Sequence, residues 1–298
     1  MKRILITGAN GFLGGRVTKQ LINNTNYDIV TVASSEDKVT DMIAREGITQ
    51  ANRLHFLSNQ MLLDSDTVLT NVYGAIHLAF ARRACPAEDI ASSLNFASAV
   101  FKKLAQSNIN RVINLSSQGI YGNTEDFRTE QTPPAPTNHY TMAKYASEVI
   151  FNTYFENSDV PNYTNMRLDL VVQSQNLVPA LCRQAKSGKI QLKGGEQRFS
   201  FIDVEDAASG VVFMLNSSDG WEKVYNLGWN RKRYKLPEVA EIVADVAVEH
   251  GYTRPEIILD KQDISLWAGM DSSRFIMHTG WQPRIDMHDM TEQIFMVS

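Results

Sequence analysis

The chain begins with Met1-Lys-Arg-Ile-Leu-Ile-Thr-Gly-Ala-Asn-Gly-Phe-Leu-Gly-Gly15, and this stretch decides the fold. Its Ile-Leu-Ile run is apolar and partly β-branched, as expected of a short buried strand. Gly8, Gly11 and Gly14 follow with the spacing G-x-x-G-x-x-G, and a helical pattern begins at Phe12. Such a helix start directs backbone N–H groups and the positive end of its dipole at a pyrophosphate. The stretch therefore predicts dinucleotide binding, in a spacing variant of the Rossmann pattern.

The composition indicates a globular protein that needs no disulfides or metal to fold. The 298 residues are enough for one large α/β domain or for a dinucleotide domain with a smaller companion. The net charge is −4 and no Lys/Arg run stands out, which argues against a nucleic-acid partner. Cys85 and Cys182 lie far apart, so no metal site is expected. With no apolar run of bilayer length and no room for a signal peptide before the first strand, we expect a cytoplasmic protein without a membrane partner.

Strands and helices alternate through the first half of the chain. Strands are expected near 28–33, 53–57, 72–79 and 111–115, and helices near 12–23, 36–46 and 87–107. This alternation predicts an α/β fold with a Rossmann-like, doubly wound parallel sheet. Such sheets bind ligands at the carboxyl ends of their strands, which is where Ser116 and Ser117 stand.

The end of the second strand bears on the choice of cofactor. NAD-binding folds usually place an acidic residue there, for the ribose hydroxyls. Here the positions hold Ala33, Ser34 and Ser35, with Glu36, Asp37 and Lys38 just beyond and no arginine. Small hydroxyls and a lysine favour NADP slightly over NAD, although either serine could simply cap the next helix.

A second motif carries the chemistry. Tyr140-Thr-Met-Ala-Lys144 opens a helix after the proline-rich loop 132–136, and residues four apart share a helix face. An ammonium beside a phenol favours the phenolate, so the pair predicts a tyrosine acid/base with a lowered pKa. A hydroxyl from Ser116-Ser117 could hold the reacting oxygen.

These pieces, in this order, resemble the extended short-chain dehydrogenases/reductases of the NAD-dependent epimerase/dehydratase type. Further matches are 76–79, Leu115-Ser-Ser-Gln-Gly-Ile-Tyr-Gly122, 197–207, 225–228 and 280–283. The resemblance implies Tyr140 as acid/base, Lys144 as its partner on the nicotinamide ribose, and Ser117 as the catalytic hydroxyl. It also implies a homodimer formed through the helix that carries Tyr140 and the helix that begins near Ala87.

The resemblance further implies a set of binding residues. The pyrophosphate and the rest of the cofactor would contact Gly8, Asn10, Gly11, Phe12, Leu13, Gly14, Ser34, Ser35, Lys38, Asn59, Ala79, Phe80, Asn95, Ser116, Tyr140 and Lys144. Asn59 is expected in a loop, and Asn95 is either an ordinary exposed helix residue or a hydrogen-bonding partner of the cofactor. Gln118 and Arg198 would bind substrate, Arg198 through a nucleotide-sugar diphosphate unless it pairs with Asp203 or Glu205. His77 is expected in the core.

Departures from the family pattern narrow the reaction. Sugar 4,6-dehydratases of this type carry Asp-Glu after the catalytic hydroxyl, where this chain has Gln118-Gly119. Position 119 also lacks the cysteine of the reductive epimerases. A 4-epimerase or a ketoreductase of a nucleotide sugar is therefore expected. An enzyme on a non-sugar alcohol or carbonyl, or a non-catalytic dinucleotide sensor, is the alternative. Arg167 is kept, but the Y-G-P that usually follows it is absent.

The second half is less regular and is expected to select the substrate. Helices are predicted near 177–186, 204–215, 236–249, 270–278 and 287–295, with short strands near 189–193, 199–202 and 225–227. We expect residues 1–165 to form the dinucleotide domain, with 200–230 partly returning to it. Residues 166–298 would then form mainly a smaller α+β substrate-binding lid.

Overall fold

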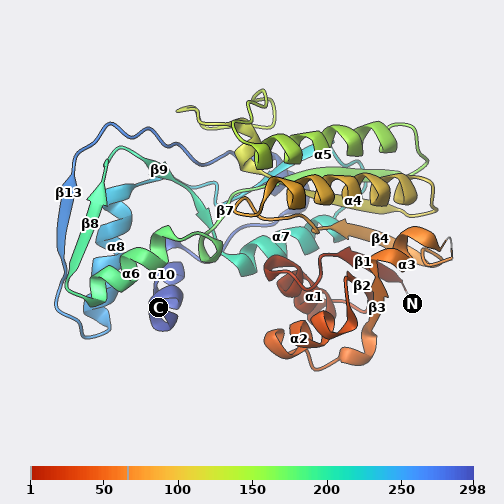
Figure 1. Ribbon diagram of the computed structural model, residues 1–298, viewed down its shortest axis with the longest axis horizontal. Helices are drawn as coiled ribbons and strands as arrows, with labels where there is room; N and C mark the ends of the chain where they lie inside the picture. Colours follow the sequence, from red (N-terminus) through yellow and green to blue (C-terminus); the bar gives the residue numbers. More distant parts are fainter. Residues whose placement is uncertain (1, 66) are drawn as a thin grey trace.

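The computed structural model describes residues 2–65 and 67–298. Its larger part is a seven-stranded sheet between two layers of helices (Figure 1). The order β11-β6-β5-β4-β1-β2-β3 and the parallel pairing of all neighbours confirm the predicted doubly wound, Rossmann-like α/β fold. The strands are β1 (Arg3–Thr7), β2 (Asp28–Ala33), β3 (Leu54–Ser58), β4 (Val72–His77), β5 (Arg111–Ser117), β6 (Asn162–Leu168) and β11 (Val224–Leu227).

Two apolar layers hold the helices on the sheet. Successive strand residues point to opposite faces, so Ile4 packs into one core and Leu5 into the other. The first core is closed by α1 (Phe12–Asn24), α2 (Glu36–Glu46) and α7 (Val204–Asn216). The second is closed by α3 (Asn59–Asp64), α4 (Ala87–Ala105) and α5 (His139–Phe155).

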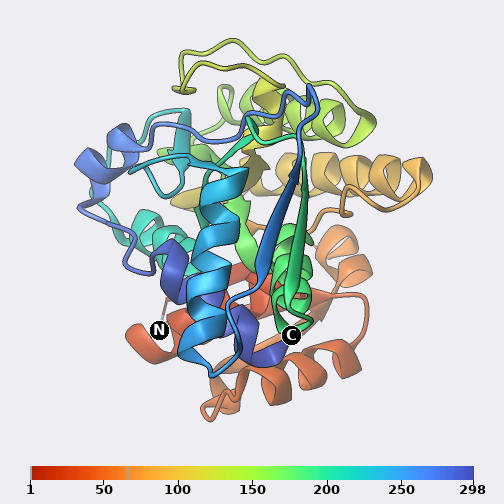
Figure 2. The same cartoon turned by 90° about the vertical axis from the view of Figure 1, so that its left-hand side faces the viewer.

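A smaller lobe stands beside the sheet and has a core of its own (Figures 1 and 2). It contains α6 (Leu177–Lys186), β8 (Lys189–Lys193), α8 (Leu236–Glu249), β13 (Glu256–Asp260) and α10 (Met287–Val297). The parallel pair β8–β13 was not predicted from the sequence, because its partners are more than sixty residues apart.

Short elements connect the lobe to the sheet. They are β7 (Leu170–Val171) paired with β10 (Phe201–Ile202), and β9 (Arg198–Phe199) paired with β12 (Tyr234–Lys235). The helix α9 (Ser273–Thr279) packs on β11, where Phe275 meets Tyr225 edge-on. Because β6 crosses residue 165 and β11 also joins the sheet, the sheet includes residues on both sides of the expected division. The division into two domains itself stays a prediction.

Candidate functional site

In the glycine turn between β1 and α1, backbone segments pack closely against one another. Gly8 has φ of 72°, and a Cβ there would lie 2.7 Å from the backbone nitrogen of Ala79. A Cβ on Gly14 would lie 2.1 Å from the Gly8 carbonyl oxygen, so neither position admits a side chain. The N-cap residue of α1, Gly11, supplies no side-chain acceptor, which leaves the helix N–H groups for an anion. These features fit the pyrophosphate of a dinucleotide.

The end of β2 places three predicted residues at the start of α2. Ser35 is the N-cap residue but makes no side-chain capping bond, whereas the Lys38 ammonium donates to the Ser34 hydroxyl at 2.8 Å. Sequence reasoning missed Arg45, at the far end of α2. Its Nη2 donates to the carbonyl oxygens of Asn10 and Gly11 in the glycine turn, at 3.2 and 3.3 Å. The crossing of α2 over α1 brings this arginine to the turn, and spacing alone gives no sign of it.

The other predicted cofactor residues lie after β3, after β4 and on α4. Asn59 is the first residue of α3, not part of a loop as expected, because the Ser58 hydroxyl caps this helix by accepting from Met61 N–H at 3.1 Å. Ala79 lies against the glycine turn, and Phe80 follows it in the loop after β4. Asn95 is exposed on α4. Whether Asn59 and Asn95 contact a cofactor stays a prediction.

Ser117, Tyr140 and Lys144 meet at the carboxyl end of β5. Asn138 and Thr141 form a capping box that fixes the start of α5, so Tyr140 lies in its first turn. The Tyr140 phenol interacts with the Ser117 hydroxyl, which also accepts a hydrogen bond from Gly119 N–H at 3.1 Å. The Phe80 ring meets the Tyr140 ring edge-on at 6.2 Å. The Lys144 ammonium lies 4.1 Å from the centre of the same Phe80 ring. Ser116, by contrast, is buried, and its hydroxyl has no partner among the described residues.

The electrostatics of this trio differ from the prediction. Burial raises the pKa of Tyr140, and the effects that oppose it come from the hydrogen bond with Ser117 and the charge of Arg83. Burial also lowers the pKa of Lys144 to about 7. The expectation that Lys144 lowers the pKa of Tyr140 is therefore wrong for the free protein, in which Lys144 donates instead to the Leu115 carbonyl at 2.8 Å.

A buried ion pair between Glu148 and Arg167 acts electrostatically on Lys144. Glu148, one turn further along α5, accepts two hydrogen bonds from Arg167 of β6, at 2.8 Å from Nη2 and 3.1 Å from Nε. The Arg167 guanidinium also lies 4.7 Å from the centre of the Tyr121 ring. The carboxylate opposes the effect of burial on Lys144 and favours its ammonium form. The arginine noted in the sequence thus supports the trio indirectly, through Glu148.

Gln118 is held by a buried arginine that sequence reasoning missed. Arg128 is 1% exposed and donates to the Gln118 side-chain oxygen at 2.6 Å and to the Gly122 carbonyl at 2.7 Å. It also donates to the Trp267 carbonyl, in the extended segment that leads from β13 back to the sheet. Arg128 therefore ties this segment to the turn that follows Ser117.

Arg198 stands on β9 beside the same segment. Its guanidinium lies 5.7 Å from the centre of the Trp267 ring, and its backbone pairs with Leu266 and Ala268. Among the described residues it forms no ion pair with Asp203 or Glu205. Asp203 instead caps α7 and accepts from Gln173, while Glu205 pairs with Arg16. Its predicted role in binding substrate stays a prediction.

His77 is a core residue, as expected. It is 1% exposed, and its Nδ1 lies 2.8 Å from the Thr7 hydroxyl. Burial, assisted by the charge of Lys144, lowers its pKa to about 3. A ring that stays neutral in this way has no part in proton transfer at neutral pH.

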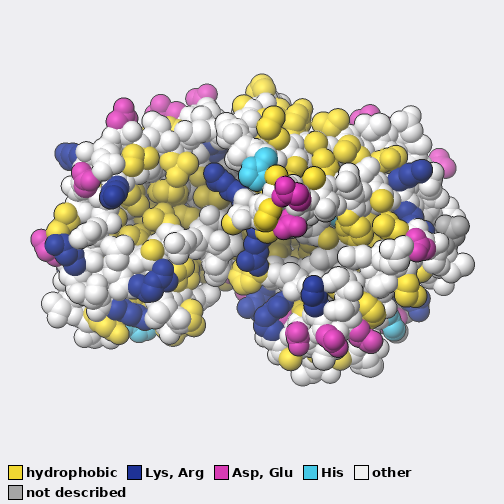
Figure 3. Space-filling view, viewed as in Figure 1, with side chains coloured by type: hydrophobic (Ala, Val, Ile, Leu, Met, Phe, Trp, Pro, Cys, Tyr) yellow, Lys and Arg dark blue, Asp and Glu magenta, His cyan; other side chains and the backbone are white. Residues whose placement is uncertain are grey.

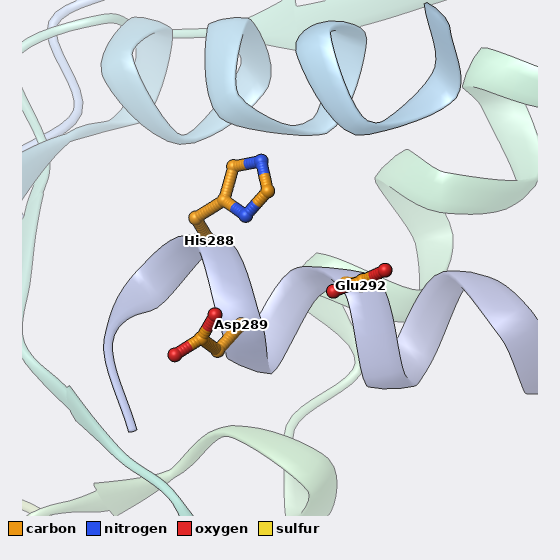
Figure 4. A group of neighbouring side chains, drawn as sticks. All are labelled: His288, Asp289 and Glu292. Atoms are coloured by element: carbon orange, nitrogen blue, oxygen red, sulfur yellow. The ribbon is translucent and has the colours of Figure 1, made fainter. Parts of the chain in front are cut away.

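One group of possible metal ligands occurs among the described residues, on α10. His288, Asp289 and Glu292 offer ligand atoms within 4.8 Å of one another, and Figure 4 shows His288 pointing toward α8. The His288 Nε2 lies 3.1 Å from Glu249, and Glu292 lies 3.7 Å from His250. These contacts join α10 to the end of α8 and involve exposed acids, and they do not indicate a metal site.

The fold and the Ser-Tyr-Lys trio define an NAD-dependent enzyme of the extended short-chain dehydrogenase/reductase type. A sequence model of the NAD dependent epimerase/dehydratase family matches residues 4–228, and the chain belongs to this family. This confirms the resemblance drawn from the motifs. Within the described part of the chain, no helix is long and apolar enough to cross a bilayer.

Curated relatives and solved structures match the chain over nearly its whole length. The low-salt glycan biosynthesis protein Agl12 of Haloferax volcanii is 23% identical, with 97% of this chain and 96% of the relative covered. A dTDP-glucose 4,6-dehydratase of Haemophilus influenzae is also 23% identical, over 96% and 94%. The structure of a Bacillus cereus UDP-glucuronic acid 4-epimerase with UDP-glucuronic acid and NAD has a TM-score of 0.80 at 17% identity, covering 98% of each chain. At this identity the likeness to the solved structure shows the fold alone.

Proposed function

We propose that this protein interconverts a hydroxyl and a keto carbon of a nucleotide-activated sugar, as a 4-epimerase or 4-ketoreductase dependent on NAD(P). The geometry of Ser117, Tyr140 and Lys144 supports the chemistry. The relatives support the substrate class, because those with named substrates act on nucleotide sugars.

Each member of the trio has a distinct task. Tyr140 moves the proton of the reacting hydroxyl, and Ser117, which already interacts with that phenol, orients the same oxygen. Lys144 holds the nicotinamide ribose, and its ammonium favours the phenolate once that ribose fixes it beside Tyr140. NAD(P), when bound, accepts or returns the hydride. An epimerase lets the keto intermediate turn and take the hydride on its other face, whereas a reductase releases the reduced product.

The choice of reaction rests on the lack of space for a side chain at Gly119. A dehydratase needs an acid/base there, but a Cβ at this position would lie 2.9 Å from the buried Thr141 methyl and 3.4 Å from the Ser117 hydroxyl. The neighbouring Gln118 cannot ionise, and its oxygen is taken by Arg128. The turn thus offers no group that could remove the C5 proton and expel water. We therefore favour epimerisation or reduction over dehydration, although dehydratases occur among the relatives.

For the cofactor we propose a modest preference for NADP over NAD. Ser34 follows β2 where the family usually places a carboxylate for the adenosine ribose, and it accepts a hydrogen bond from Lys38, although Glu36 and Asp37 also lie in the first turn of α2. Arg45, at the edge of the glycine turn, adds a guanidinium that suits a phosphate, although it shares Glu46 with Arg16. A Lys38→Ala variant would then raise the KM for NADPH several-fold and leave the KM for NADH unchanged.

We also propose that Arg198 binds the diphosphate of the nucleotide sugar. Its side chain is half-buried beside Trp267, and its charge acts on the carboxylates of Glu196 and Glu238 without a direct ion pair among the described residues. Thermal shift with UDP alone tests this, because a shift that disappears in Arg198→Ala supports it.

The test of the reaction is product analysis. The protein is incubated with a panel of UDP- and dTDP-sugars and either NAD or NADP, and the products are identified by NMR. A C4 epimer, or a C4 alcohol formed from a 4-keto sugar, is expected. A 4-keto-6-deoxy sugar would overturn the choice, and inertness toward every nucleotide sugar would overturn the substrate class.

A second candidate is a reductase or dehydrogenase of a non-sugar alcohol or carbonyl. It is favoured by the segment after β6, where Leu170-Val-Val-Gln173 replaces the family's N-V-Y-G and Val172 is fully buried. A non-catalytic dinucleotide sensor is disfavoured, because a sensor has no need of the intact trio.

We further propose a homodimer that forms through α4 and α5, in a cytoplasmic setting that suits the free thiols of Cys85 and Cys182. The two helices pack along each other, and α5 exposes Met142 and Val149 by 59% and 48%. These residues are seven apart, so they share one outer face.

A further inference from the structure

The glycine turn is contacted from the end of α2 by charged side chains. The Arg45 Nη2 donates to the carbonyl oxygens of Asn10 and Gly11, at 3.2 and 3.3 Å. The Arg45 Nε donates to the Glu46 carboxylate at 2.8 Å. Figure 3 shows Lys and Arg side chains beside acidic ones over the region where α1 and α2 lie. Arg45 therefore contacts the turn directly, and Glu46 contacts Arg45.

Glu46 is a buried carboxylate whose two oxygens are bound by two different arginines. Its side chain is only 1% exposed, and its Oε1 accepts from Arg45 while its Oε2 accepts from Arg16 of α1. The Arg16 Nε lies 3.0 Å from a carboxylate oxygen of Glu205, at the start of α7. A buried carboxylate costs free energy unless cations pair with it. The two arginines supply that pairing, and the carboxylate in turn fixes the position of Arg45.

Gly15 leaves the space that these side chains occupy. A Cβ at this position would lie 2.7 Å from Glu46 Oε1 and 2.8 Å from Arg45 Nη2. Gly15 lies within α1, where glycine is less favourable than alanine. It is not one of the three spaced glycines of the turn, so the turn itself does not require it. The missing side chain instead lets the Arg45–Glu46 pair pack against α1.

The carbonyls that Arg45 binds belong to the peptides at the start of α1. A peptide is planar and trans, so its N–H points away from its C=O. Holding the Gly11 carbonyl toward Arg45 therefore directs the Phe12 N–H to the opposite side of the chain. The Gly11 N–H is bonded to the Gly8 carbonyl at 2.9 Å, whereas the N–H groups of the first helical turn are the donors that a helix offers to an anion.

We propose that Glu46 is a positioning residue for the cofactor, because it holds Arg45 against the glycine turn and so fixes the N–H groups that receive the pyrophosphate. NAD and NADP share this pyrophosphate, so the effect is the same for both cofactors and for any substrate. A direct contact of Arg45 with a 2′-phosphate would act on NADP alone.

The experiment measures the Kd for NADH and for NADPH by their fluorescence, and the Tm of each variant without cofactor. Arg45→Met should raise both Kd values about 5- to 20-fold, because the charged donor to two carbonyls is lost. Glu46→Gln should raise both about 3- to 10-fold, because an amide offers one acceptor oxygen in place of two. In the double variant, both Kd values should equal those of Arg45→Met alone, because Glu46 acts through Arg45.

Two further variants separate positioning from stability. Gly15→Ala displaces the charged pair but favours the helix, so both Kd values should rise about 3- to 10-fold with a smaller fall in Tm than in Arg53→Met. Arg53 is the matched control, because its guanidinium donates to the carbonyls of Ile22 and Thr25 at the other end of α1, at 2.8 Å each. Arg53→Met should lower the Tm and leave both Kd values within about 2-fold of the wild type.

Unchanged Kd values in Arg45→Met would overturn the proposal. A rise confined to NADPH would also overturn it, since that result assigns Arg45 to the 2′-phosphate. A further rise when Glu46→Gln is added to Arg45→Met would show that Glu46 acts independently of Arg45, and a rise in Arg53→Met as large as in Arg45→Met would show a general loss of stability. Either result would overturn the positioning role. Cofactor binding is measured without turnover of a nucleotide sugar, so failure here is distinguishable from failure of the proposed function.

Discussion

The Lys144 ammonium donates a 2.8 Å hydrogen bond to the Leu115 carbonyl, two residues before the Ser117 hydroxyl. Because β5 and α5 are separated in sequence, this bond ties α5, which carries Tyr140 and Lys144, to β5, which carries Ser117. The ammonium is buried, which lowers the pKa of Lys144 to about 7 in the free protein. Burial of this ammonium therefore costs free energy of folding.

This cost predicts a pH-dependent stability. The folded pKa of about 7 lies below the unfolded value near 10.4, so between these values only the unfolded chain holds the proton. The free energy of unfolding should therefore rise with pH from 7 to 10. Lys144→Met should stabilise the free protein at pH 6, by an amount on the order of a few kcal/mol, and lose this advantage by pH 10. Urea denaturation at both pH values measures this, and an advantage independent of pH would contradict it.

Removing the Tyr140 hydroxyl tests the acid/base assignment. Tyr140→Phe should lower kcat by a factor of about 10² to 10⁴, because a positioned proton donor is lost. The Phe80 contact needs only the ring, so the Kd for NAD(P) should stay within about 3-fold of the wild type. Single-turnover rates and cofactor fluorescence give the two quantities. Full activity in this variant would refute the assignment.

The sequence predicted the glycine turn, the Tyr140–Lys144 pair and most elements because these are local patterns, whereas the choice of Ser117 came from the family resemblance. The bounds of β2, α6, β8 and α8 agree with the structure residue by residue. Arg45 and Arg128 escaped prediction for the opposite reason. Their partners at Gly11 and Trp267 are 34 and 139 residues away, and only tertiary packing brings them together. The pKa shifts of Tyr140 and Lys144 could not be predicted from the sequence either, since they depend on burial.

The Asp169 carboxyl predicts a second pH dependence of stability, opposite in sign to that of Lys144. This carboxyl at the end of β6 is 4% exposed, one of its oxygens has no partner among the described residues, and burial raises its pKa to about 6. The folded state thus holds a proton that the unfolded chain releases near pH 4, so stability falls as pH rises from 4 to 6. Asp169→Asn should match the wild type at pH 4 and exceed it by about 1 to 3 kcal/mol at pH 8. Thermal unfolding at the two pH values decides this. A variant that is less stable at pH 8 would contradict it.

Arg128 predicts a local effect on the segment that leads back from β13. Its three hydrogen-bond partners are Gln118, Gly122 and Trp267, and Arg128→Met leaves these buried acceptors unpaired. The expected loss is about 2 to 5 kcal/mol of stability. Hydrogen exchange should rise in residues 265–271 and in the turn 118–122, and stay unchanged in β1. Arg254→Met is the matched control, because Arg254 is exposed and pairs with Asp245 and Glu241 on the surface of α8. A uniform rise in exchange across the sheet would contradict the local role.

The outer face of α5 provides the test of the proposed homodimer. Met142 and Val149 are large apolar side chains that stay exposed in the single chain, on the helix whose first turn contains Tyr140. A symmetric contact would bring each face against its copy, so one charge per chain places two like charges together. Val149→Glu should therefore shift the protein from dimer to monomer in analytical ultracentrifugation, while Met277→Glu, on the exposed face of α9, should not. Because Val149 points away from Lys144 and Glu148, the variant monomer should keep the fold and the cofactor affinity. A wild type that sediments as a monomer at micromolar concentration would refute the dimer, and a dimer that survives Val149→Glu would place the interface elsewhere.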